Sequence, residues 1–217
     1  MSPRRGCLLA LALLIAGCAG ERLQARRATL PPPAPGNRAG THDLGAGPGP
    51  GPSRVQARRV PLETAARTAV GVASGLVGAR EIVVGGVEYG DGCAALVRAA
   101  YASAGVAVEA GDAAALHSRA AAEGRTRRHR PAAGDLVFLA DRPGGPAEHV
   151  GLVERVGTDG TVVVLHRLES GVARVRLNGT QPWKARDENG KTLNDVLIVG
   201  AGRVTVARLL VGYASVR

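Results

Sequence analysis

The chain has 217 residues, and its 28 basic and 18 acidic side chains give a formal charge of +10. Apolar residues make up 45% of it, which excludes an intrinsically disordered protein, and no apolar run approaches the ~18 residues of a spanning helix, which excludes a polytopic membrane protein. Aromatic residues make up only 2%, too few for a surface on which single-stranded nucleic acid would stack, so we expect no nucleic-acid partner.

The first 17 residues have the pattern of an export signal, because Arg4 and Arg5 precede a short apolar run. The sequence Ile15-Ala16-Gly17-Cys18 resembles the box of bacterial lipoproteins, in which the cysteine is lipidated. This resemblance implies that residues 1–17 are removed and that Cys18 becomes a lipid-bearing N-terminus. Ala19 after it implies the outer rather than the inner membrane. Two alternatives remain open, an ordinary signal cleaved near Ala19 and a twin-arginine signal.

Residues 18–60 are predicted to be the lipidated cysteine and a linker. They contain Pro31–Pro35 and the alternating Gly47–Pro52, which can form neither a helix nor a central strand. Such a linker spans on the order of 35 Å. We therefore expect a domain anchored by lipid in the cell envelope, at the outer membrane and facing the periplasm.

Residues 61–217 have the length of one domain. Apolar residues at helical spacing predict helices over 61–78, 93–104 and 112–123, the last capped by Asp112. The period then changes to two and predicts strands over 135–140, 149–156, 161–166, 172–177 and 195–199; a last apolar run over 209–216 fits a strand or a helix. Helices followed by adjacent strands predict an α+β fold, with the N-terminal helices packed on an antiparallel sheet.

Cys93 stands at the predicted start of the second helix, after the glycine-rich stretch Tyr89–Gly92. The free N–H groups and the partial positive charge of a helix N-terminus favour a thiolate and could hold an oxyanion. A nucleophilic cysteine also needs a base, and His149 and His166 stand at the ends of neighbouring predicted strands. A zinc site of these three residues is an alternative, but no short Cys/His ligand pair supports it, so we expect neither a metal nor a cofactor.

Whether the two histidines meet depends on the hairpin between their strands. A two-residue turn at Gly157-Thr158 would place His166 directly opposite His149, where it could orient the base. A turn at Asp159-Gly160, which is the stronger turn signal, would place His166 opposite Val153, roughly 13 Å from His149. In the second case a bulge or a longer loop is needed to restore the contact.

Residues 65–105 and 131–178 resemble the NlpC-like cell-wall cysteine peptidases and the related CHAP amidases. The segments that carry the resemblance are Cys93–Tyr101 with Ala104-Gly105-Val106, Gly134-Asp135-Leu136-Val137-Phe138, His149-Val150-Gly151-Leu152-Val153 and Leu165-His166. The resemblance implies a papain-like fold and cleavage of peptide or amide bonds in peptidoglycan. It assigns Cys93 as nucleophile, His149 as general base and His166 as the residue that orients the base.

Three further residues are candidates for substrate binding. Tyr89 could reach the space of a tyrosine that the family commonly has before its glycine pair, where this chain has Ile82. Asp91 could cap the cysteine helix. Trp183 could line a ligand groove, although a buried or half-buried tryptophan is the commoner case.

Two functions follow as hypotheses. The first is a peptidoglycan hydrolase, either a peptidase that cuts after the D-glutamyl unit or an amidase that cuts between glycan and peptide. The second is a catalytically inactive domain that binds wall polymer or a partner hydrolase. Gly92, Ala94 and Ile82 favour the second. Gly92 and Ala94 replace the aspartate and serine that usually flank the family's cysteine, and Ile82 replaces the tyrosine before the glycine pair.

Overall fold

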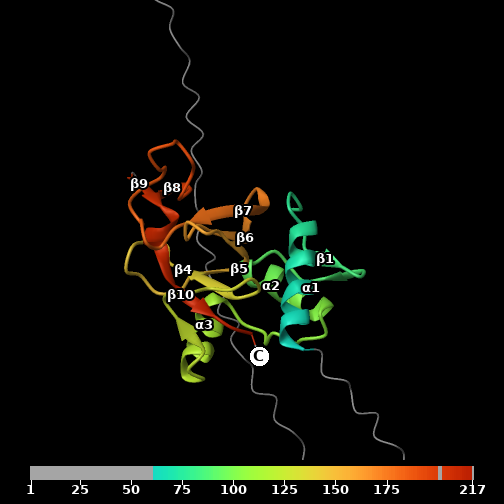
Figure 1. Cartoon of the computed structure of the whole chain (residues 1–217). Helices are drawn as coiled ribbons and strands as arrows, with labels where there is room; N and C mark the ends of the chain where they lie inside the picture. Colours follow the sequence, from blue (N-terminus) through green and yellow to red (C-terminus); the bar gives the residue numbers. More distant parts are fainter. Residues whose placement is uncertain (1–60, 200–201, 217) are drawn as a thin grey trace, which may run out of the picture. The chain divides into compact units, whose positions relative to one another are not determined.

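The computed structural model describes residues 61–199 and 202–216 (Figure 1). The predicted signal, Cys18 and the linker lie outside the described residues. Within the two described ranges, no helix has the length and apolar character needed to cross a membrane.

The three predicted helices are present, and their ends lie within three residues of the predicted ones. They are α1 (Leu62–Gly75), α2 (Cys93–Ser103) and α3 (Ala113–Ala122). The predicted cap of α3 is confirmed, since the Asp112 carboxylate accepts a hydrogen bond of 2.8 Å from the backbone N–H of Ala115.

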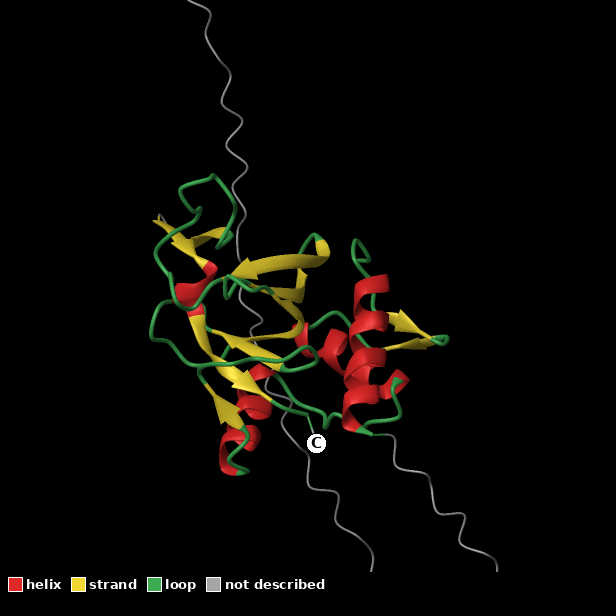
Figure 2. Cartoon of the chain, viewed as in Figure 1, coloured by secondary structure: helices red, strands yellow, loops and turns green. Residues whose placement is uncertain are grey.

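An antiparallel sheet of six strands, in the order β3-β10-β4-β5-β6-β7, forms the centre of the domain (Figure 2). Its strands are β3 (Thr126–Arg127), β4 (Leu136–Leu139), β5 (His149–Val156), β6 (Val162–Leu168), β7 (Gly171–Leu177) and β10 (Leu210–Ala214). Two hairpins lie outside it, β1 (Val83–Val84) with β2 (Val87–Glu88) and β8 (Val196–Val199) with β9 (Gly202–Thr205). The ambiguous run over 209–216 follows a short 3₁₀ helix, η1 (Val206–Leu209), and forms β10. The predicted α+β class is confirmed.

Both faces of the sheet are covered, so its central strands are buried throughout. Leu136 and Phe138 of β4 belong to one core, which they share with the helices, while Val137 and Leu139 belong to a second core, which they share with η1. A strand buried on both faces reads as a continuous apolar run, and β4 does.

Helix α1 packs on the core through small residues. Ala65, Ala69 and Ala73 are its buried residues, whereas the larger apolar Leu62 is 52% exposed. The small side chains allow close approach to the segment before β4, because a Cβ built on Gly134 would lie 2.5 Å from that of Ala66.

Candidate active site

The candidate nucleophile Cys93 is the first residue of α2, and its thiol is free and half-buried. The preceding Gly92 is extended and caps α2 without a side chain. Helix α2 packs against the start of β5, where the first residue is His149. The sulfur interacts there with the His149 ring and with the backbone of Val150 and Ala94.

These interactions lower the pKa of Cys93 and raise the pKa of His149, so the two values move toward each other. Burial raises the pKa of the Cys93 thiol, but the hydrogen bond and charge of His149 and the backbone of Val150 outweigh it, so the pKa is lowered. The interaction with Cys93 raises the pKa of His149, and Asp141 raises it further. Burial of the ring lowers this pKa, but by less, so the net shift is upward. The pair therefore favours a thiolate beside an imidazolium, which is the reactive form of a cysteine nucleophile.

Asp141 holds the other side of the His149 ring. Its Oδ1 lies 2.6 Å from His149 Nε2, a short contact between groups that are 55% and 35% exposed at their side chains. The sequence patterns alone do not predict a role for Asp141. The signal that could have found it is the pairing of neighbouring strands: Leu139 at the end of β4 is opposite His149, so the loop residue that follows β4 lies near the base.

His166 lies against His149 but does not make the hydrogen bond that was predicted to orient it. The ring centroids are 5.7 Å apart at 67°, an edge-to-face contact. Both ring nitrogens of His166 are buried without a well-formed hydrogen bond among the described residues. Burial, with a further contribution from the charge of His149, lowers the pKa of His166 to about 4, so its ring is neutral at pH 7. The hydrogen-bonded partner of His149 is Asp141 instead.

The contact of the two rings depends on a register that matches neither predicted turn. A three-residue loop, Thr158–Gly160, closes the hairpin: Gly157 N–H donates to Thr161 at 2.7 Å, and Gly160 is left-handed. Such a loop alone would turn the His166 side chain to the face away from His149. A bulge between Val153 and Arg155 shifts the pairing by one residue, so that Leu152 is opposite Leu165 and His166 returns to the His149 face.

Glu154 is the residue that the bulge leaves unpaired, and its side chain connects β5 to α1 and β7. Its carboxylate accepts a hydrogen bond of 2.7 Å from Ser74 of α1 and three hydrogen bonds of 2.8–3.0 Å from Arg174 of β7. The hydrogen bonds from Arg174 lower the pKa of Glu154 against the opposing effect of burial. The bulge is thus fixed from two sides.

Replacing Gly151 with alanine is expected to disturb this site and the fold together. The added Cβ would lie 2.7 Å from Val164 Cγ1, 2.9 Å from the Leu165 carbonyl oxygen and 3.3 Å from His166 Cδ2. Overpacking of this kind costs about 1–3 kcal/mol. Chemical denaturation should show that loss, whereas Gly92→Ala, whose Cβ meets nothing within 4 Å, should change stability by less than about 1 kcal/mol. Equal stability of the two variants would contradict the close packing of His166 on Gly151.

The three predicted substrate-binding residues are placed differently from one another. Tyr89 is half-buried against the core shared with the helices, and its carbonyl oxygen accepts a hydrogen bond of 3.0 Å from Arg98. Asp91 is exposed, and the prediction that it caps α2 is wrong, because no side chain caps that helix. Trp183 is 76% exposed on the loop after β7. That end of β7 pairs with Val162, whereas His166 pairs with Ala173 near the other end, so the structure does not bring Trp183 to the histidines.

Within the described ranges, no three His, Cys, Asp or Glu side chains converge as a metal site. The site consists of a sulfur, an imidazole and a carboxylate in line, with a neutral imidazole packed beside them. This arrangement suits nucleophilic attack on a carbonyl carbon and proton transfer to a leaving group.

One family model matches the part of the chain that contains this site. Residues 83–167 match the CHAP domain, a range that includes Cys93, His149, Asp141 and His166. None of the curated proteins compared with the chain matches it. The match agrees with the predicted papain-like α+β class.

Three solved structures are similar to the chain at low identity. The crystal structure of Ly7917 is 19% identical, with 70% of this chain and 62% of that chain covered and a TM-score of 0.42. The crystal structure of Ly7917 with the hydrolyzing product of MDP is 17% identical, with the same coverage and TM-score. An NlpC/P60 family protein from Bacillus cereus ATCC 10987 is 19% identical, with 70% of this chain and 40% of that chain covered and a TM-score of 0.44. The chain thus spans less than two thirds of each of these proteins.

Proposed function

We propose that the chain is a peptidoglycan hydrolase that cleaves a peptide or amide bond with a cysteine nucleophile, and the match of residues 83–167 to the CHAP domain supports this proposal. The observation that carries the proposal is that Cys93 interacts with the ring of His149, whose Nε2 makes a hydrogen bond with Asp141. In this proposal Cys93 is the nucleophile, His149 is the general base and acid, and Asp141 positions His149.

The reaction follows from the charges of these groups. The Cys93 thiolate attacks the carbonyl carbon of the scissile amide, and the negative charge passes to the carbonyl oxygen. Backbone N–H groups at the start of α2 are the available donors for that oxyanion. The His149 imidazolium gives its proton to the leaving nitrogen, which departs as an amine and leaves a thioester. His149, now neutral, takes a proton from water, whose oxygen attacks the thioester and releases the Cys93 thiolate and a carboxylic acid, which then loses its proton to the solvent.

The masses of the products separate the two kinds of hydrolase. The full chain is incubated with purified peptidoglycan, and the soluble fragments are identified by mass spectrometry. A peptidase releases fragments cut within the stem peptide, after the D-glutamyl unit, and an amidase releases whole stem peptides from the glycan. Either product supports the proposal, whereas no fragment beyond those of a protein-free control would overturn it.

A catalytically inactive domain that binds wall polymer is the second candidate, and the start of α2 is the observation that favours it. Gly92 supplies no side-chain cap, exposed Asp91 does not replace one, and Ala94 is buried where the family commonly has a polar serine. This candidate predicts a Cys93 thiol of ordinary reactivity, which the pH dependence of its alkylation by iodoacetamide tests.

We further propose that the protein is a lipoprotein, anchored through Cys18 in the cell envelope at the outer membrane and facing the periplasm. Each buried CH₂ of an attached acyl chain contributes ~0.8 kcal/mol to membrane binding. Replacing Cys18 with serine should therefore move the protein from the membrane fraction to the soluble fraction, measured by immunoblot after centrifugation. A Cys18→Ser variant that stays with the membrane would overturn the anchor, while Cys7→Ser serves as the matched control and should leave the distribution unchanged.

A further inference from the structure

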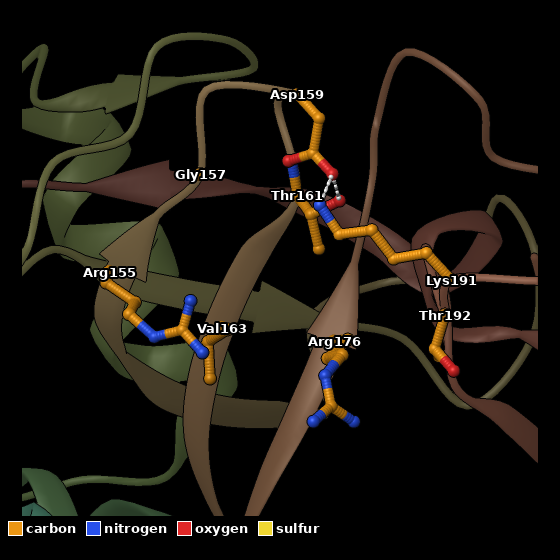
Figure 3. A pocket seen from close by; sticks show the side chains of 8 residues that line it. All are labelled: Arg155, Gly157, Asp159, Thr161, Val163, Arg176, Lys191 and Thr192. Atoms are coloured by element: carbon orange, nitrogen blue, oxygen red, sulfur yellow. Dashed lines mark hydrogen bonds and ion pairs between the residues drawn. The ribbon is translucent and has the colours of Figure 1, made fainter. Parts of the chain in front are cut away.

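A pocket of about 350 Å³ opens at the end of the sheet that is remote from the candidate active site (Figure 3). It is lined by Arg155, Gly157, Asp159, Thr161, Val163, Arg176, Lys191 and Thr192. Arg155 is six residues along β5 from His149, which at ~3.3 Å per residue separates the two sites by roughly 20 Å. The pocket is therefore not a part of the cysteine site.

Two arginines bracket this pocket because of the strand register. Arg155 of β5 is opposite Val163 of β6, and Val163 is in turn opposite Arg176 of β7. Residues in register share a face of the sheet, and the outer two strands are separated by two strand spacings, roughly 9–10 Å. Val163 is only 2% exposed and lies on the strand between the strands of the two arginines (Figure 3).

The acidic groups at the pocket are engaged by two of the basic side chains that line it. Asp159 binds Lys191 Nζ at 2.7 Å and also accepts hydrogen bonds from the N–H and the hydroxyl of Thr161. Asp195 accepts the backbone N–H of Arg176 at 2.7 Å, and its other oxygen is 3.9 Å from the Arg176 guanidinium.

The Arg155 guanidinium makes no ion pair or hydrogen bond in the part of the chain that the structure describes, although its charge helps to lower the pKa of the adjacent Glu154. Arg176 has a distant partner in Asp195 at 3.9 Å, whereas the charge of Arg155 adds to that of Arg176 without an ion pair of its own. The pocket therefore carries positive charge that a bound anion would neutralise.

We propose that this pocket binds a phosphate group, held between the guanidinium groups of Arg155 and Arg176. A phosphate monoester carries about −1.5 to −2 charges at pH 7, which matches two guanidinium groups, and its tetrahedral oxygens accept hydrogen bonds from both sides at once. The Thr192 hydroxyl on the pocket wall is a further donor. The apolar side chain of Val163 can contact the carbon skeleton of a phosphate ester. The inference does not rest on the proposed hydrolase activity.

Calorimetric titration of the full chain with inorganic phosphate tests the site. The wild type is expected to bind, Arg155→Gln and Arg176→Gln should each weaken binding at least tenfold, and the double variant should show no heat of binding. Arg80→Gln is the matched control, because Arg80 is exposed in the loop between α1 and β1, outside the pocket lining. Circular dichroism verifies that each variant is folded. Equal binding by all variants, or no binding by the wild type, would overturn the proposal.

Competition experiments then distinguish the ligand class and its source. Acetate that binds as tightly as phosphate would overturn the choice of phosphate over carboxylate. Displacement of inorganic phosphate by glucose 1-phosphate supports a phosphorylated glycan, and displacement by short-chain phosphatidic acid supports a lipid headgroup. If neither ester displaces it, the pocket holds an adventitious ion only, and the proposal fails.

Discussion

Replacing Cys93 with alanine is expected to abolish peptidoglycan cleavage, with a fall in kcat of at least about 10⁴-fold. The variant removes the atom that forms the thioester, and no other described cysteine can replace it. The rate of fragment release, followed by mass spectrometry, gives the measurement. The fold should survive, because the thiol is only half-buried and a Cβ remains.

The matched control for that variant is Ser103→Ala. Ser103 is the last residue of α2, and its hydroxyl donates a hydrogen bond of 2.9 Å to the Ala99 carbonyl oxygen. It therefore loses one heavy atom from the same helix, at the other end, and should keep full activity. Cleavage by Cys93→Ala at the rate of the control would remove Cys93 from the mechanism.

Replacing Asp141 with asparagine is expected to lower kcat by about 10- to 100-fold and to narrow the pH profile of kcat/KM. The Asp141 carboxylate binds His149 Nε2 at 2.6 Å and helps to raise the pKa of His149. More than half of the Asp141 side chain is exposed, so solvent screening keeps the effect below that of a buried triad acid.

The pH profile of kcat/KM has an acid and an alkaline limb, and the direction in which each moves follows from the pKa shifts of Cys93 and His149. The alkaline limb reports loss of the His149 proton, and since Asp141 helps to raise that pKa, its loss moves this limb to lower pH. The acid limb reports ionisation of Cys93, whose pKa His149 lowers, and a weaker imidazolium moves this limb to higher pH. Asp91→Asn is the control, an exposed carboxylate close to Cys93 in sequence, and should leave both limbs in place. An unchanged profile in Asp141→Asn would show that Asp141 does not position His149.

The sequence predicts most of what holds the cysteine and the first histidine in place. Helix α2 begins at Cys93 as expected, because the glycine-rich stretch before it cannot continue a helix and alanines and leucine follow it. Strand β5 has the predicted ends, His149 and Val156, because its apolar period is clear.

The hairpin register could not be predicted, because two departures from ideal geometry compensate each other. The three-residue loop and the bulge at Glu154 each shift the pairing by one residue, and only together do they keep His166 on the His149 face. The bulge is fixed by contacts of Glu154 with Ser74 and Arg174, which are far away in sequence. No local pattern contains that information.

Asp141 and the short strands were missed for a related reason. Strands β1, β2 and β3 have two residues each, which is too short for any period to show. Asp141 lies in a loop, and only the antiparallel pairing of β4 with β5 brings it to the base. The family resemblance predicts that His166, at the family's third polar position, orients His149. In the described residues the buried ring of His166 makes no hydrogen bond to His149.

The most direct test of the reactive pair is the pH dependence of Cys93 alkylation by iodoacetamide in the full chain, with the modified peptide resolved by mass spectrometry. A Cys93 thiolate stabilised by His149 should react with a midpoint well below the ~8.5 of a free thiol, and His149→Ala should move that midpoint up toward the free value. A wild-type midpoint at or above ~8.5, unchanged in His149→Ala, would contradict the account and favour the inactive domain.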